Sequence, residues 1–121
     1  MKYDNDNIFA KILRGEIPCK KIFENEFVLS FYDINPQKKI HALIIPKGPY
    51  IDLDDFIKNA KEKEILEFFK AISHVAKLLK ISNIEGGYRT LSNIAKNGMQ
   101  EVPHLHFHLF GGENVGKMVS N

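Results

Sequence analysis

The chain has 121 residues, 44% of them hydrophobic and 26% charged, which suits a single compact domain with its own core. Its 17 basic and 15 acidic residues leave a net charge of only +2, and the interleaving of lysines with acids excludes the basic stripe of a nucleic-acid-binding surface. No apolar run could span a bilayer and residues 1–6 do not resemble a targeting segment, so we expect a cytoplasmic protein with no membrane or nucleic-acid partner. The single cysteine, Cys19, can form no internal disulfide, and we interpret it as a small buried apolar residue.

The first half of the chain predicts a short helix and three strands. Asn5 or Asp6 can cap the helix, Gly15 is placed to end it, and its apolar stripe consists of Ile8, Phe9, Ile12 and Leu13. Strands are expected over residues 20–24, 27–32 and 39–45, with a loop over 33–37 and with Pro46 ending the third strand. On that third strand, His41 shares a face with Leu43 and Ile45.

The second half predicts one long helix and two further strands. Apolar residues recur at helical spacing over residues 61–80, after a segment that offers only a helical turn near 53–57. We interpret His74 on the long helix as a surface residue. A strand is expected over 88–93, then a turn-rich loop over 95–101 and a last strand, and the tail over 113–121 carries little pattern. This order of elements favours a mainly antiparallel sheet with helical cover.

The segment Pro103–Gly112 holds three of the five histidines. They alternate with large apolar residues, and this period of two predicts a strand with imidazoles on one face and apolar side chains on the other: His104, His106 and His108 against Leu105, Phe107 and Leu109. Titratable rings placed side by side repel one another when charged and lose solvation when buried. An arrangement with such a cost indicates a functional site.

Two kinds of chemistry could use this face. Imidazoles can ligate zinc, copper or iron, but the outer rings of an extended strand lie about 13 Å apart, so an ion would need a pair plus a distant ligand such as His41. Alternatively, a neutral imidazole attacks phosphorus, and water then discharges the labile product. The loop around Asn97 and Gly98 can offer backbone N–H groups, and Asn93 a side-chain donor, to the phosphoryl oxygens. We favour this second interpretation because it uses more of the neighbouring sequence.

The run from Gln100 to Leu109 resembles the His-x-His-x-His signature of the histidine-triad (HIT) superfamily of nucleotide hydrolases and transferases. Further segments resemble, in order, the landmarks of its Hint-like branch: Ile8–Ile12 with Gly15–Pro18, Phe31–Gln37, His41–Lys47 and Gly87–Arg89. The match covers about residues 7–112 of a single domain over 1–121. The resemblance implies an α+β fold with a five-stranded, mainly antiparallel sheet and two helices, usually paired as a homodimer.

The activity implied by the resemblance is hydrolysis of a nucleoside phosphoramidate or related nucleotidyl ester through a covalent nucleotidyl-histidine intermediate. It releases a purine nucleoside monophosphate and needs no metal or other cofactor. By position in the motif, His106 is the nucleophile, His104 orients it, His108 contacts the phosphate, and His41 supports the triad. The other matching positions bind nucleotide: Asp33 and Ile34 for ribose and base, and Asn93, Gln100, Glu101 and Val102 for the phosphate.

Three loop residues depart from the family pattern. Ala95 and Met99 stand where Hint-like members commonly have glycine, and Glu101 occupies a position that is serine in some members. Because a carboxylate repels a phosphate, we expect the backbone N–H of Glu101 rather than its side chain to bind. The altered loop motivates one alternative, a nucleotide-binding interaction module without turnover. A His-ligated metalloprotein is the second and less favoured alternative.

Overall fold

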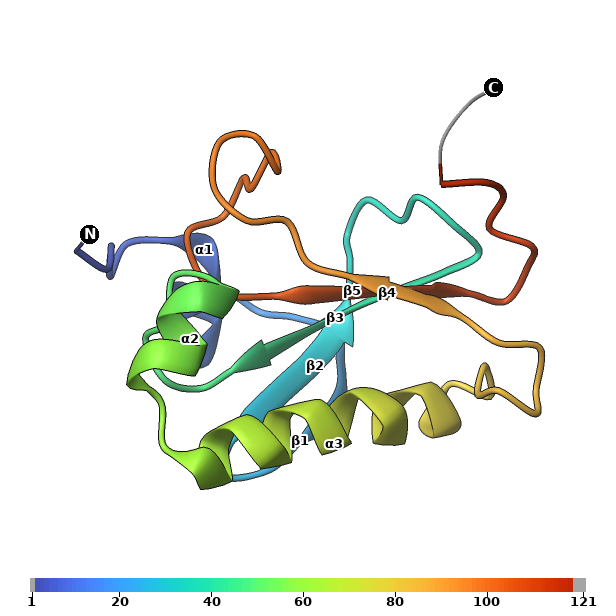
Figure 1. The fold of residues 1–121 in the computed structure, drawn as a ribbon, viewed down its shortest axis with the longest axis horizontal. Helices are drawn as coiled ribbons and strands as arrows, with labels where there is room; N and C mark the ends of the chain where they lie inside the picture. Colours follow the sequence, from blue (N-terminus) through green and yellow to red (C-terminus); the bar gives the residue numbers. More distant parts are fainter. Residues whose placement is uncertain (1, 119–121) are drawn as a thin grey trace.

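The structure, a computed structural model, describes residues 2–118, so the end of the tail for which little order was expected lies outside the described residues. Five strands form one antiparallel sheet in the order β1-β2-β3-β5-β4 (Figure 1). They are β1 (Lys21–Glu24), β2 (Val28–Tyr32), β3 (Ile40–Pro46), β4 (Arg89–Leu91) and β5 (Phe107–Gly111). The helices are α1 (Ile8–Leu13), α2 (Leu53–Asn59) and α3 (Glu62–Leu78). The predicted α+β class is confirmed, with one helix more than the two expected.

The N-caps of α1 and α2 show which residues begin each helix. The N-cap of α1 is Asn7 rather than Asn5 or Asp6, because its side-chain oxygen accepts a hydrogen bond from the Ala10 N–H at 2.9 Å. Asp52 caps the additional helix, α2, where the sequence suggested only a turn, and the fully buried Phe56 ties α2 to the core. None of the helices within residues 2–118 is long and apolar enough to cross a membrane.

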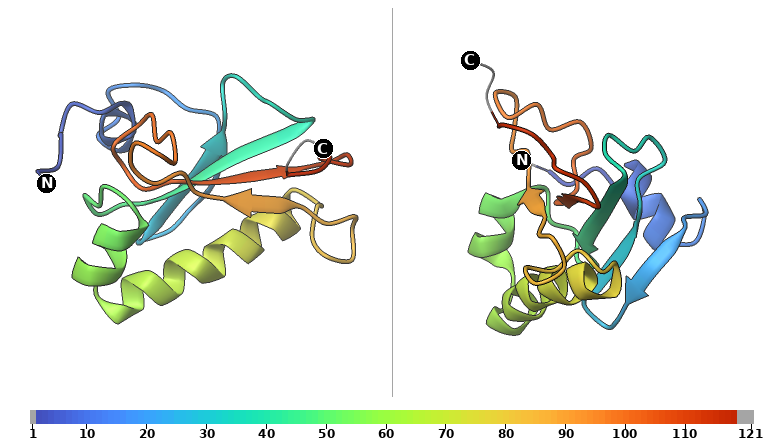
Figure 2. Two further views of the ribbon diagram at one scale, coloured as in Figure 1. Left: turned by 45° about the horizontal axis from the view of Figure 1, so that its top comes forward. Right: turned by 90° about the vertical axis from the view of Figure 1, so that its right-hand side faces the viewer.

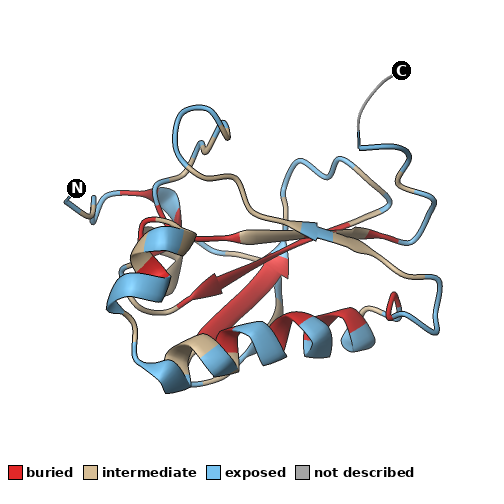
Figure 3. Cartoon of the chain, viewed as in Figure 1, coloured by how far each residue is buried: buried red, intermediate tan, exposed pale blue. Residues whose placement is uncertain are grey.

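The sheet has two unlike faces (Figure 2). On one, which we call the α3 face, α2 and α3 cover the larger apolar cluster, whose fully buried members include Ile44, Phe56, Phe68, Val75 and Leu109. On the other, the α1 face, the short α1 covers a smaller cluster formed by Phe9, Leu29, Phe31, Leu43 and Ile45. The central strands and the inner side of α3 are accordingly buried (Figure 3). Cys19 packs against the smaller cluster and is half-buried rather than fully buried.

Strand alternation is confirmed in β3, where His41 lies on the α1 face with Leu43 and Ile45 while Ala42 and Ile44 enter the larger cluster. The histidine strand is shorter than predicted, because β5 begins only at Phe107. Before that point the backbone bonds to loops instead of a neighbouring strand: the Leu105 N–H donates to the Tyr50 carbonyl, and the Ser92 hydroxyl donates to the His106 carbonyl. The side chains nevertheless keep the predicted alternation, since Leu105, Phe107 and Leu109 all join the larger cluster.

Candidate functional site

A cavity of about 390 Å³ opens on the α1 face, and we call it the histidine cavity. It is lined by Phe9, Asp33, Asn35, Gln37, His41, Leu43, Asn93, Met99, Glu101, Val102, His106 and His108. Seven of these twelve were predicted site residues, namely Asp33, His41, Asn93, Glu101, Val102, His106 and His108. The volume falls in the range typical of small-molecule sites. Segments that are distant in the sequence therefore meet at the face of the sheet on which His106 and His108 lie.

A larger depression of about 830 Å³ lies elsewhere, between the segment 85–89 before and at the start of β4 and residues 112–115 after β5. No histidine, cysteine or serine lines it within residues 2–118. Chemistry therefore favours the smaller, histidine-lined cavity over the larger depression as the functional site.

His106 presents one free ring nitrogen. Its Nδ1 lies 2.8 Å from the His104 carbonyl oxygen, and because a carbonyl only accepts, the proton is on Nδ1 and the lone pair on Nε2. No buried side-chain nitrogen or oxygen within residues 2–118 lacks a partner, so the unbonded Nε2 must reach the cavity. Burial lowers the pKa of His106, against the opposing effects of the His104 carbonyl and of the Asp33 and Glu101 carboxylates. The ring is thus neutral at physiological pH, as a nucleophile requires.

His104 does not line the cavity, but its backbone carbonyl holds the His106 ring in place. Its side chain is fully buried, with Nε2 donating to the Pro46 carbonyl at 2.9 Å and Nδ1 accepting from the Tyr3 hydroxyl at 2.6 Å. Burial, reinforced by the nearby His106, lowers the pKa of His104 to about 4 despite the bond to Pro46. A neutral ring held at both nitrogens locks the backbone whose carbonyl sets the His106 tautomer.

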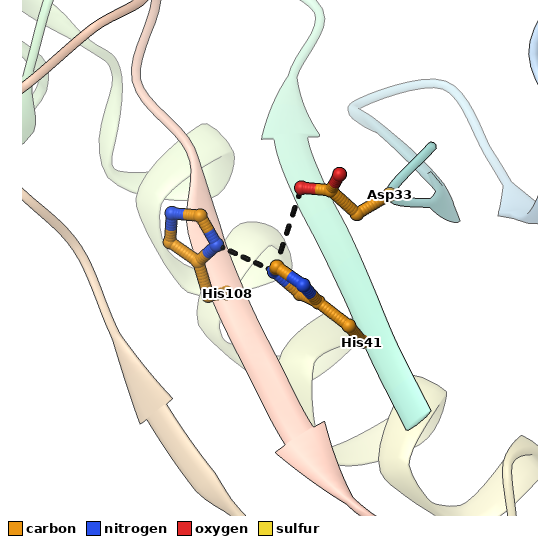
Figure 4. A group of neighbouring side chains, drawn as sticks. All are labelled: Asp33, His41 and His108. Atoms are coloured by element: carbon orange, nitrogen blue, oxygen red, sulfur yellow. Dashed lines mark hydrogen bonds and ion pairs between the residues drawn. The ribbon is translucent and has the colours of Figure 1, made fainter. Parts of the chain in front are cut away.

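His108 and His41 form a hydrogen-bonded pair (Figure 4). The Gln37 backbone N–H lies 3.1 Å from His41 Nδ1, and an N–H only donates, so the proton of neutral His41 is on Nε2. That Nε2–H faces His108 Nδ1 at 2.9 Å, which leaves the His108 proton on Nε2. Burial, followed by the neighbouring His106 and His41, lowers the pKa of His108 to about 4. His108 therefore offers an N–H donor beside the lone pair of His106.

The same pair tests the metal alternative. Asp33, His41 and His108 each place one ligand atom within 4.8 Å of the others, which is close enough to consider a shared ion (Figure 4). Ligation through His41 Nε2 requires a lone pair there and the proton on Nδ1, where it would face the Gln37 N–H. The hydrogen bonds at both nitrogens of His41 therefore fit a fixed neutral imidazole better than a cation ligand, and Asp33 Oδ2 lies 3.5 Å from the same Nε2 that faces His108.

The loop over 93–102 closes one side of the cavity through internal bonds. The Gln100 amide donates to the carbonyls of Ile51 and Val102 and accepts from the Ala95 N–H, so this predicted binding residue ties the loop to the body and does not line the cavity. The backbone N–H groups of Glu101 and Val102 make no hydrogen bond within the described residues and remain available to a ligand. Ile34, the predicted base contact, is 84% exposed and also lies outside the lining.

Five lining residues and one supporting residue were not identified from the sequence. Phe9 packs edge-on against His106 with ring centroids 5.0 Å apart, and Leu43 and Met99 add further apolar surface. Asn35 and Gln37 belong to the predicted 33–37 loop, and the signal that could have identified them was the resemblance of Phe31–Gln37 to a landmark of the family. Tyr3 is 101 positions from His104, and nothing in the local pattern links them.

Known proteins resemble this chain over almost its whole length. The family model described as HIT domain matches residues 14–115. An uncharacterized 13.2 kDa HIT-like protein of Azospirillum brasilense is 52% identical over 118 residues, covering 98% of this chain and 95% of that protein. The purine nucleoside phosphoramidase of Escherichia coli is 37% identical over 117 residues, covering 96% and 95%. A solved HIT family hydrolase from Legionella pneumophila superposes with a TM-score of 0.82 at 34% identity, covering 92% of this chain and 96% of that one.

Proposed function

Given that this chain belongs to the HIT domain family, whose hydrolase fold it shares, we propose that it hydrolyses a nucleoside phosphoramidate or related nucleotidyl ester and releases a purine nucleoside monophosphate. One observation carries the proposal: His106 holds its proton on Nδ1 against the His104 carbonyl and turns a free Nε2 toward the cavity. The similarity to a purine nucleoside phosphoramidase supports this substrate class.

In the first step, Nε2 of His106 attacks phosphorus and forms the N–P bond as the bond from phosphorus to the leaving group breaks. The electron pair of that bond goes to the leaving nitrogen or oxygen, which takes up a proton from solvent. The His106 ring becomes cationic, and the His104 carbonyl that accepts the Nδ1–H stabilises that charge. His108 Nε2–H and the backbone N–H groups of Glu101 and Val102 are the donors for the phosphoryl oxygens.

In the second step, water attacks the phosphorus of the nucleotidyl-histidine and the N–P bond breaks. The electron pair returns to Nε2, the nucleoside monophosphate leaves, and the water loses its proton to solvent. His106 regains its starting tautomer because the Nδ1–H never leaves the His104 carbonyl. Asp33 and Ile34 remain the proposed ribose and base contacts, and Asn93 a further phosphate contact. No step calls on a metal or other cofactor.

Replacing the nucleophile tests the proposal. With an adenosine phosphoramidate as substrate, His106→Ala should lower turnover by several powers of ten, because the covalent route is lost while the fold remains. His74→Ala is the matched control, since His74 is an exposed histidine of α3 that packs on Phe23 outside the cavity. Rapid quenching and mass spectrometry of the wild type should locate nucleotide on His106. Unchanged turnover by His106→Ala would reject the assignment.

The alternative of a binding module without turnover has its own signature. Both residues that replace the usual loop glycines, Ala95 and Met99, adopt a left-handed backbone, with φ of 57° and 58°. If this strained loop were built for binding alone, the wild type would bind adenosine monophosphate but turn over no amidate or ester. Calorimetric titration with the monophosphate, alongside the turnover assay, separates the two functions.

We also propose that the chain forms a homodimer. β4 is an edge strand that pairs with β5, and α3 exposes two neighbouring large apolar side chains, Leu66 at 54% and Phe69 at 39%. Such surface is costly to leave in water and favours a second copy. Light scattering should give twice the chain mass, and Phe69→Lys should shift the protein towards the monomer.

A further inference from the structure

The histidine cavity has an unusual charge for a phosphate-binding site. Its acidic side chains are the carboxylates of Asp33 and Glu101, and no lysine or arginine lines it among the described residues. The lining histidines are neutral there, since burial lowers the pKa of His41, His106 and His108. A nucleotidyl group, which brings its own negative charge, therefore meets a cavity that is already negative.

Of the two carboxylates, Glu101 is the one without a local function. Asp33 lies 3.5 Å from His41 Nε2 and accepts the backbone N–H of Asn35. Glu101 is exposed at the cavity rim and forms no ion pair with any residue in 2–118. A free carboxylate that borders the nucleophile is placed to act on the part of the substrate that projects out of the cavity.

From this charge distribution we infer that Glu101 determines leaving-group specificity and selects nucleoside phosphoramidates whose amine carries an additional positive charge. The inference rests on the proposed function and names the substrate class within it. An ammonium group on the leaving arm neutralises the rim carboxylate and offsets the repulsion of the phosphoryl group. A leaving arm with a carboxylate adds a third negative charge to the cavity and is disfavoured.

The leaving nitrogen itself gains from the same carboxylate. When the leaving nitrogen takes up its proton before the P–N bond breaks, that nitrogen is cationic at the cavity rim until the electron pair of the bond returns to it and the neutral amine departs. Glu101 stabilises that charge, whereas a leaving oxygen that departs as an anion is repelled. The neighbouring cavity charge thus favours amides over esters as well as cationic arms over acidic ones.

Three substrates test the inference. They are adenosine phosphoramidates of linear amines of equal length that end in an ammonium, a hydroxyl or a carboxylate group. We expect kcat/KM to fall in that order by about fivefold at each step at low salt, the scale of an exposed charge pair, and the spread to shrink as salt is added. In Glu101→Gln the ratio between ammonium and carboxylate substrates should fall to about threefold or less.

The control is Glu26→Gln, which removes an equal charge from an exposed residue outside the cavity and should keep the wild-type ratio. Because each ratio is taken within one protein preparation, partial unfolding of a variant cancels. Equal kcat/KM for the three substrates, or a Glu101→Gln ratio equal to that of the wild type, would overturn the inference and leave the proposed function intact. No turnover of any of the three would overturn both.

Discussion

The α3 face and the α1 face are built from alternate residues of the same strands, yet they bury different chemistry. On the α3 face of the sheet the buried strand residues are apolar except for Ser30, whose hydroxyl donates to the Leu43 carbonyl, and Phe56, Phe68 and Leu109 are fully buried. On the α1 face His104 and His106 are just as inaccessible, at 0% and 5% exposure. The difference is that imidazoles can be buried only with partners, and no buried polar side-chain atom within residues 2–118 lacks one.

Stability and reactivity are therefore divided between the faces. The stability of the α3 face comes from the packing of apolar side chains, which do not titrate. The α1 face depends on hydrogen bonds that fix each tautomer. Among the histidine ring nitrogens that line the cavity within residues 2–118, His106 Nε2 is the unbonded acceptor, and it is the proposed reacting atom. A substitution on the α3 face should lower the free energy of unfolding more than it lowers turnover. A substitution among the histidines of the α1 face should change turnover or the pH dependence of stability.

The largest expected effect comes from breaking the α3 face. Phe68 is fully buried and contacts both Phe56 and Phe107 edge-on, so Phe68→Ala leaves a cavity and should lower the free energy of unfolding by about 3–5 kcal/mol. Lys70→Ala, an exposed position of the same helix, should change it by less than about 0.5 kcal/mol. Urea denaturation measures both. A Phe68→Ala protein as stable as Lys70→Ala would show that the α3 face is not the stabilising one.

The next effect is a pH dependence confined to the α1 face. The pKa of both His104 and His108 is about 4 in the folded protein against 6.5 in the unfolded chain. Between these values the unfolded chain binds more protons, so the free energy of unfolding falls as pH drops from about 6.5 towards 4 and is fully regained above 6.5.

Urea denaturation at several pH values between 5 and 6.5 measures this slope above the range where most carboxylates titrate. His108→Asn, whose amide oxygen can still accept the His41 Nε2–H, should flatten the slope, whereas His74→Gln on the exposed side of α3 should not. A flat profile for the wild type would mean that the buried imidazoles are not held neutral.

A smaller effect is expected where the N-terminal segment supports the α1 face. Tyr3→Phe removes the donor to His104 Nδ1 and leaves a buried acceptor unpaired, at a cost of about 1–3 kcal/mol. Because His104 then holds its carbonyl less firmly, kcat should fall severalfold with little change in KM. The control is Tyr32→Phe, an exposed tyrosine at the end of β2. If stability falls but kcat does not, Tyr3 serves the fold alone.

Tyr3 also marks the limit of what the sequence could predict. Helical spacing identified α1 and α3, and alternation identified the faces of β3 and of the histidine strand. The other strands were identified as short runs between turn signals. Alternation placed His106 and His108 on one face of their strand, and the family resemblance placed His41 beside them; all three line one cavity. The contact between Tyr3 and His104 depends on the tertiary fold, and so does the backbone bonding that makes β5 begin only at Phe107.

The tautomers of the site histidines could not be predicted from the sequence either. They follow from which carbonyl or N–H faces each ring, as the Pro46 carbonyl faces His104 and the Gln37 N–H faces His41. The helix α2 was underestimated because its seven residues carry too few apolar positions to show a period, and burial of Phe56 had to be seen in the structure.

The smallest expected effect lies in the loop that joins the faces at the cavity rim. Met99 holds φ at 58° while its side chain is 76% exposed, so Met99→Gly relieves a left-handed backbone and loses little packing. Glycine also makes the unfolded chain more flexible, which offsets part of the gain, so we expect a net stabilisation of about 0.5 kcal/mol.

Gly98→Ala should do the opposite in the same loop, because its added Cβ would clash with the Ile94 carbonyl oxygen and force the turn open. Thermal unfolding of Met99→Gly, Gly98→Ala and the wild type measures both effects: the midpoint should rise slightly for Met99→Gly and fall for Gly98→Ala. Destabilisation of Met99→Gly by 1 kcal/mol or more would show that the methionine side chain, despite its exposure, belongs to the apolar surface of the cavity, and the boundary of the α1 face would then extend over this loop.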